Sequence, residues 1–153
     1  STADDYVVKA SAGPVYTVAA FQTGDIPQLP NTEAWNNNLE CVLITDDGSV
    51  GKRGRVTQFL DELVGQGRLT KDTYVFACGP TPMFAALQTA LAPHGIRCEA
   101  ATEEFMGCGF GVCFGCTLKV KEDDGKVGYR LCCADGCIFP LDRLVFDGHG
   151  HGH

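Results

Sequence analysis

Three cysteines stand close together in a glycine-rich stretch, EEFMGCGFGVCFGC, at residues 103–116. They are Cys108, Cys113 and Cys116, and their spacing is C-x4-C-x2-C. This is the spacing of plant-type [2Fe–2S] sites, which take a fourth cysteine from further along the chain. The intervening glycines let the backbone wrap closely around a small inorganic core, because glycine accepts a positive φ. The pattern therefore predicts a [2Fe–2S] site.

The fourth ligand must come from the segment YRLCCADGCIF, which returns after a predicted hairpin. Its cysteines are Cys132, Cys133 and Cys137. If this segment is an extended strand, neighbouring side chains face opposite ways. Cys132 and Cys133 should then not both be ligands, but spacing does not choose between them.

Other uses of these cysteines explain less of the pattern. Zinc accepts four thiolates without needing the x4 spacing. A redox-active dithiol at Cys113 and Cys116 leaves Cys108 and the glycines without a role. A disulfide knot in a secreted fragment does not suit nine cysteines, an odd number, or the acidic N-terminus STADDYVVKA. We therefore expect a metal site in a reducing, cytoplasmic setting.

Composition excludes several classes of partner. The 153 residues carry a formal net charge of −7, which disfavours nucleic acid and anionic membrane surfaces. The longest apolar runs, such as VYTVAAF, are far shorter than the ~18 residues that a membrane-spanning helix needs. Hydrophobic residues make up 44%, an ordinary share for a soluble globular protein.

Strand-like and helix-like segments alternate along the first hundred residues. The predicted strands are 15–22, 39–45, 73–79 and 96–103, and the predicted helices are 55–67 and 82–95. This order predicts a parallel sheet with crossover helices. The polar, turn-rich segment 22–38 is expected to be a loop.

At about residue 103 the composition changes to glycine and cysteine. Strands are predicted at 116–122 and 127–133, joined by the turn DDGK. We expect an α/β lobe at 1–102, a small cluster domain at 103–147 and a flexible Gly-His tail at 148–153.

Taken together, these motifs resemble the electron-transfer subunit of NAD-dependent dihydroorotate dehydrogenase. The resemblance rests on EEFMGCGFGVCFGC with CADGCIF, on TDDGSVGKRGRVTQFLDELV and on YVFACGPTPMFAAL, in the family's order, and covers roughly 40–139. It implies an α/β fold: a partial Rossmann-like parallel sheet, as in the nucleotide lobe of ferredoxin reductases, followed by a small C-terminal [2Fe–2S] domain.

The same resemblance implies a function. In this family electrons pass from NADH to FAD, and through the cluster to a flavin in a partner subunit. The family's last ligand precedes an x-D-G-P-[VI]-F pattern, which implies Cys133 as the fourth ligand beside Cys108, Cys113 and Cys116. We therefore expect an electron-transfer component of pyrimidine biosynthesis that forms a hetero-oligomer with a flavin-containing oxidoreductase subunit and is not catalytic alone.

The sequence departs from the family in its first half. Within these 153 residues we expect neither the family's flavin-binding barrel nor the glycine-rich turn that opens the nucleotide lobe, and we expect the sequence to begin at about that lobe's first helix. FAD and NAD are thus expected only if other domains or chains complete the site. A non-enzymatic assembly module that holds zinc or a cluster is the alternative function.

A few residues of the lobe are candidates for contact with a ligand. Cys78, Gly79 and Pro80 follow a strand at the sheet edge where α/β proteins bind ligands, and in the family this turn lies by the nicotinamide. The alternative is a tight strand-to-helix turn with a buried cysteine. Residues 46–49 are expected to be a plain turn and His94 a surface residue. Glu103 and Glu104 are expected to be solvated or to form a local cap, and not to be catalytic acids.

Overall fold

The computed structural model describes residues 6–10, 15–21, 39–49 and 51–146. The predicted loop at 22–38 and the tail at 148–153 lie outside these residues. The strands are β1 (Tyr6–Ala10), β2 (Val15–Phe21), β3 (Leu39–Thr45), β4 (Lys52–Arg53), β5 (Tyr74–Cys78), β6 (Arg97–Ala101), β7 (Thr117–Lys121), β8 (Val127–Leu131) and β9 (Ile138–Pro140). The helices are α1 (Val56–Gly65), α2 (Thr81–Leu91) and α3 (Cys132–Asp135), with 3-10 turns η2 (Ala92–His94) and η3 (Leu141–Arg143).

The main sheet is mixed: the four strands predicted for a parallel sheet run in one direction, and the antiparallel strands β1 and β9, which were not predicted, correct the purely parallel arrangement. Its order is β4-β3-β2-β1-β5-β6-β9. β2 to β6 run in one direction, while β1 is antiparallel to both β2 and β5, and β9 is antiparallel to β6. The placement of the start of the sequence at about a helix was also wrong for Tyr6–Ala10, which form β1. A short connection joins β1 to β2, and a parallel pairing needs a crossover of a dozen or more residues.

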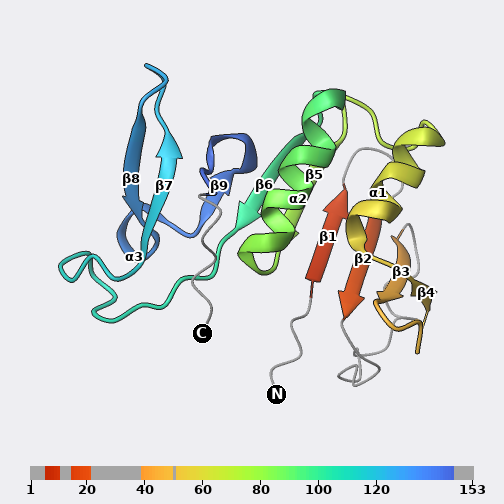
Figure 1. The fold of residues 1–153 in the computed structure, drawn as a ribbon, viewed down its shortest axis with the longest axis horizontal. Coiled ribbons are helices and arrows are strands. Elements are labelled where there is room, and N and C mark those ends of the chain that lie inside the picture. The colour runs from red at the N-terminus through yellow and green to blue at the C-terminus, as the bar shows by residue number, and fades with distance from the viewer. Residues whose placement is uncertain (1–5, 11–14, 22–38, 50, 147–153) are drawn as a thin grey trace.

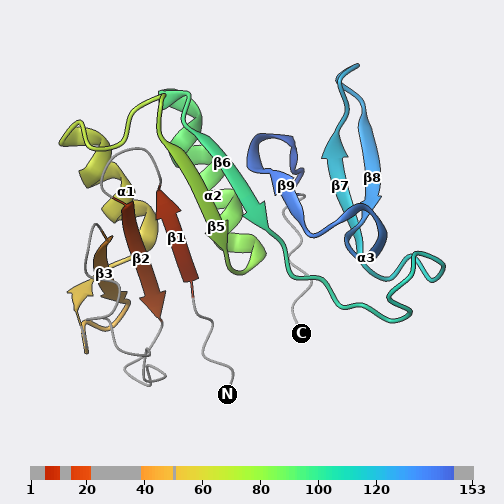
Figure 2. The ribbon, with the colours of Figure 1, turned by 180° about the vertical axis from the view of Figure 1, so that it is seen from behind.

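Helices α1 and α2 cover one face of the sheet (Figures 1 and 2). The predicted helical spacing in α1 is confirmed, because Val56, Phe59, Leu60 and Leu63 are all buried. In strand β5 buried and less buried side chains alternate, and the buried residues Val75 and Ala77 belong to the core beneath the helices. This apolar layer holds the strands β2 to β6 in place, and the carboxyl ends of these strands lie along the same end of the sheet.

The cysteine-rich part is tied to that sheet. β7 and β8 form a separate antiparallel hairpin beside it (Figure 1), and β9 then returns to pair with β6, with Ala101 opposite Ile138. The predicted strand 127–133 ends early, since Cys132–Asp135 form the short helix α3. Within the described residues, the structure contains no helix with the length and apolarity needed to cross a bilayer.

Candidate functional site

The β7–β8 hairpin brings two distant cysteines together. Cys116 lies just before β7 and Cys133 just after β8, and Thr117 pairs with Leu131 in the hairpin. The Cys132 N–H donates to the Cys116 carbonyl at 3.0 Å. As a result the Sγ atoms of Cys116 and Cys133 lie 3.2 Å apart.

Cys108 and Cys113 form a second pair in the cysteine loop, which we define as residues 103–116 between β6 and β7. Backbone N–H groups of Phe110, Cys113 and Val112 donate to the Cys108 sulfur and lower the pKa of its thiol to about 6, and a side-chain hydrogen bond with Cys113 adds to this. Gly115 N–H donates to the Cys113 sulfur at 3.4 Å. The loop thus turns N–H groups toward sulfur, an arrangement that stabilises thiolates.

The backbone conformation favours glycine at position 111 of the cysteine loop. Gly111 has a φ of +85°, and a Cβ there would lie 3.2 Å from the Cβ of Ala134 in α3. The cysteine loop therefore approaches α3 so closely that a side chain at position 111 would require Ala134 to shift by a few tenths of an ångström. Phe114, by contrast, is a non-glycine residue with a positive φ, 58°.

The structure separates Cys132 from Cys133, although not for the reason expected. Both lie in the first turn of α3 and not in an extended strand. Cys132 is 3% exposed, and its thiol donates to the Thr102 carbonyl at 3.8 Å. Burial raises the pKa of Cys132. Cys137 is exposed, and its carbonyl accepts from the Thr102 N–H at 2.8 Å.

The donor set is arranged in pairs. In the described part of the chain, no three or more Cys, His, Asp or Glu side chains form a group that could hold a single metal ion. A four-cysteine [2Fe–2S] cluster gives each iron two thiolates. The chemistry of the pairs Cys108/Cys113 and Cys116/Cys133 fits such a group.

The second predicted site follows β5. Cys78 ends the strand, Gly79 is buried, and Pro80 precedes α2, so the three residues form a tight strand-to-helix turn. The Cys78 sulfur lies 3.9 Å from Glu103 Oε1, and the pKa of Cys78 is raised, chiefly by burial and then by the Glu103 carboxylate. Glu103 is exposed, as expected.

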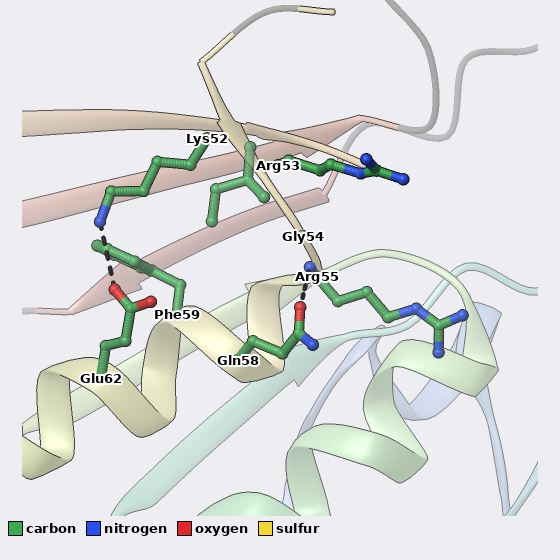
Figure 3. Close-up of a pocket in the computed structure, with 8 residues that line it drawn as sticks. Lys52, Arg53, Gly54, Arg55, Gln58, Phe59 and Glu62 are labelled. Carbon is green, nitrogen blue, oxygen red and sulfur yellow. Dashed lines mark hydrogen bonds and ion pairs between the residues drawn. The ribbon is translucent and has the colours of Figure 1, made fainter. Parts of the chain in front are cut away.

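A pocket that the sequence analysis did not find lies after β3, where α1 begins (Figure 3). It has a volume of ≈ 310 Å³ and is lined by Ile44, Lys52, Arg53, Gly54, Arg55, Gln58, Phe59 and Glu62. Lys52 Nζ bonds Glu62 Oε2 at 3.2 Å and lies 4.7 Å from the centre of the Phe59 ring.

Two cations of this pocket are not neutralised by the described chain. No carboxylate of residues 39–49 or 51–146 pairs with the guanidinium of Arg53 or Arg55. Gly54 N–H donates to the Thr45 carbonyl at 3.0 Å, and Gln58 Oε1 accepts from the Arg55 N–H at 2.9 Å. The signal in the sequence is the cation-rich run GKRGR at 51–55, a few residues after the predicted strand 39–45. Asp47 and Ser49 nearby form the expected turn, with Ser49 N–H 2.9 Å from Asp47 Oδ1.

Comparison with known proteins adds to this geometry. Residues 103–145 match the family described as "Iron-sulfur cluster binding domain of dihydroorotate dehydrogenase B". A solved NADH-dependent reduced ferredoxin–NADP oxidoreductase shares the fold over 72% of this chain and 37% of its own, with a TM-score of 0.56 and 23% identity.

Relatives in sequence are electron transfer subunits of dihydroorotate dehydrogenase B (NAD(+)). That of Caldanaerobacter subterraneus is 38% identical over 70% of this chain and 41% of its own length. That of Geobacillus thermodenitrificans is 39% identical over 69% of this chain and 38% of its own length. That of Bacillus cereus is 30% identical over 86% of this chain and 47% of its own length. The chain thus spans less than half the length of these relatives. In sequence, residues 103–145 thus match the iron–sulfur cluster binding domain of dihydroorotate dehydrogenase B, and the chain is similar to part of that enzyme's electron transfer subunits.

Proposed function

We propose that this chain relays single electrons through a [2Fe–2S] cluster held by Cys108, Cys113, Cys116 and Cys133. The observation that carries the proposal is the Cys116–Cys133 sulfur pair, 3.2 Å apart, inside the segment that matches the iron–sulfur family. When bound, the cluster accepts and releases one electron at a time. The protein holds it through four thiolates and through the N–H groups aimed at sulfur, which set the reduction potential.

The cysteine loop supports contact with a partner protein. Phe105, Phe110 and Phe114 are 85%, 71% and 69% exposed, and Met106 and Val112 are exposed beside them. No charged residue occurs between Phe105 and Leu118 in a chain of net charge −7. Apolar side chains gathered on one surface mark interaction sites. We place the flavin-containing oxidoreductase subunit there, in a hetero-oligomer of the dihydroorotate dehydrogenase type.

The lobe supports part of a nucleotide site. β3 and β5 run in the same direction, so the cationic pocket and the turn at Cys78–Pro80 lie on one edge of the sheet. Three strand spacings separate these strands, about 14 Å. An extended ligand with an anionic part, such as NAD or FAD, suits this span, with Arg53 and Arg55 on phosphate and Cys78, Gly79 and Pro80 at the other end. Completion of this site by other domains or chains is part of the proposal.

The experiment is anaerobic purification followed by iron, sulfide and zinc assays and EPR after dithionite. We expect iron and sulfide in equal amounts and a reduced-cluster signal. Cys108→Ser and Cys113→Ser should lose the signal, whereas Cys137→Ser, at an exposed position, should keep it. A normal cluster in both of the first two variants would rule out this ligand set.

The alternative function is a structural or assembly module with zinc at the same thiolates. Zinc also accepts four cysteines. The same assay separates the two, since a colourless chain with zinc and no sulfide would replace electron transfer by a scaffold role.

A further inference from the structure

Cys116 and Cys133 are placed so that they can bond to each other. Their sulfurs are 3.2 Å apart, and the Cys133 N–H also donates to the Cys116 sulfur at 3.4 Å. The hydrogen bond from Cys132 N–H to the Cys116 carbonyl, 3.0 Å, holds the two backbones side by side. The S–S bond of a disulfide is about 2.05 Å long, so the two sulfurs need to approach by only about 1 Å to form it.

We propose that Cys116 and Cys133 form a reversible disulfide when the chain carries no cluster, and that this bond closes the site to iron until a dithiol reduces it. The disulfide rests on the geometry of the two residues. Its effect on the site rests on the proposed function, in which the same two sulfurs are ligands. The bond joins the two ends of the β7–β8 hairpin and removes two of the four thiolates.

The chemistry is thiol–disulfide exchange with a small-molecule disulfide such as oxidised glutathione. The thiolate of one cysteine attacks a glutathione sulfur, which forms a mixed disulfide and releases one reduced glutathione. The thiolate of the second cysteine attacks the protein sulfur of that mixed disulfide and releases the other glutathione. Two electrons and the two thiol protons thus leave the protein, and glutathione disulfide is reduced to two thiols.

The neighbouring cysteines are held away from this reaction. Cys132 is buried, and its thiol contacts both the hydroxyl and the carbonyl of Thr102 at 3.8 Å. Cys137 is exposed, but its backbone is fixed through its carbonyl to Thr102. The Cys133 sulfur, by contrast, lies 3.2 Å from the Cys116 sulfur.

The test uses the full chain, freed of iron by a chelator under reducing conditions and then treated with oxidised glutathione. Digestion and mass spectrometry without reductant should give one peptide pair that joins residues 116 and 133. Cys133→Ser should abolish this pair, while Cys132→Ser and Cys137→Ser should keep it. A bond from Cys116 to Cys132 or Cys137, or free thiols at 116 and 133 after treatment, would overturn the proposal.

Uptake of iron and sulfide tests the closure of the site. The oxidised chain should take up none, and dithiothreitol should restore uptake to the level of the untreated chain. Uptake by fully cross-linked protein would overturn the closure. If the reduced chain binds no cluster but the Cys116–Cys133 disulfide still forms, the proposed function is wrong and the disulfide proposal holds. If the chain binds the cluster but the disulfide never forms, the proposed function holds and the disulfide proposal is wrong.

Discussion

The side chain of Gln88 in α2 donates a hydrogen bond of 2.6 Å from Nε2 to the main-chain carbonyl of Leu141. The same nitrogen donates to the Leu144 carbonyl at 2.9 Å. Leu141 and Leu144 are both buried and follow β9, so a single amide joins the helical layer to the segment that returns from the cysteine loop.

Replacement of Gln88 by Met should therefore destabilise the chain. Methionine keeps the length of the side chain but removes the Gln88 donor from both carbonyls. The Leu141 carbonyl keeps the Leu144 N–H at 3.2 Å, and the loss of a donor to a buried acceptor costs about 1–3 kcal/mol. We expect the free energy of unfolding to fall by about 2 kcal/mol in urea titrations. Thr89→Ala, on the next and exposed position of α2, is the control and should cost less than half as much.

Gly111→Ala should damage the site more than the fold. The positive φ costs a non-glycine residue about 1–2 kcal/mol, and the new Cβ would press on Ala134. We expect loss of stability of this size and a reduced iron content after reconstitution. Gly65→Ala, where a Cβ meets nothing within 4 Å, should instead stabilise α1 by about 0.5–1 kcal/mol. Equal iron content and stability in Gly111→Ala and wild type would contradict the close packing of the loop against α3.

Cys98 should make the fold sensitive to alkaline pH. Burial raises the pKa of this thiol to about 12 from an ordinary value of 9.0. The unfolded chain therefore loses the proton first, and the contribution to stability is complete below pH 9 and lost as the pH rises toward 12. Between pH 8 and pH 10 the wild type should lose about 1 kcal/mol more than Cys98→Val in urea unfolding. Identical pH profiles for the two proteins would contradict the burial of Cys98.

Arg53→Gln should weaken binding of an anionic nucleotide. A hydrogen bond to a charged group contributes about 1.5–3 kcal/mol, which corresponds to a loss in affinity of about tenfold or more. Calorimetry with ADP as the probe measures this loss, which should shrink as salt is added. Lys126→Gln makes the same charge change on the β7–β8 turn, far along the chain from the pocket, and should leave the affinity unchanged. An equal loss of ADP affinity in both variants would show that net charge, and not the pocket, determines the binding.

Much of the local structure was open to prediction from the sequence. The helical periodicity of α1 and the apolar run of β5 were visible in the sequence, although in β5 only one face is buried and Phe76 is exposed. The position of β1 was not, since Tyr6–Ala10 acquires its place only by pairing with β5, a contact between residues far apart in the chain. Short elements such as β4 and β9 are likewise fixed by their sheet neighbours more than by their own residues.

The candidate site divides in the same way. The spacing of Cys108, Cys113 and Cys116 is local and could be read directly. Cys133 was preferred to Cys132 because of the family resemblance alone. In the structure this preference is supported by the register of the β7–β8 hairpin and by the hydrogen bonds of Cys132 to Thr102. The cationic pocket could not be predicted from the sequence, because its hollow shape depends on how β3, β4 and α1 pack against one another.

The antiparallel β1 at the centre of the sheet has a consequence for synthesis on the ribosome. β1 and β2 can pair as soon as both have left the exit tunnel, but the other edge of β1 matches β5, with Val7 opposite Cys78. Until Tyr74–Cys78 has been made, the nascent chain carries an unpaired strand edge of the kind that joins other chains. Slow translation of residues 22–73 should thus raise aggregation of the newborn protein, and a chaperone that covers the β1 edge should relieve it.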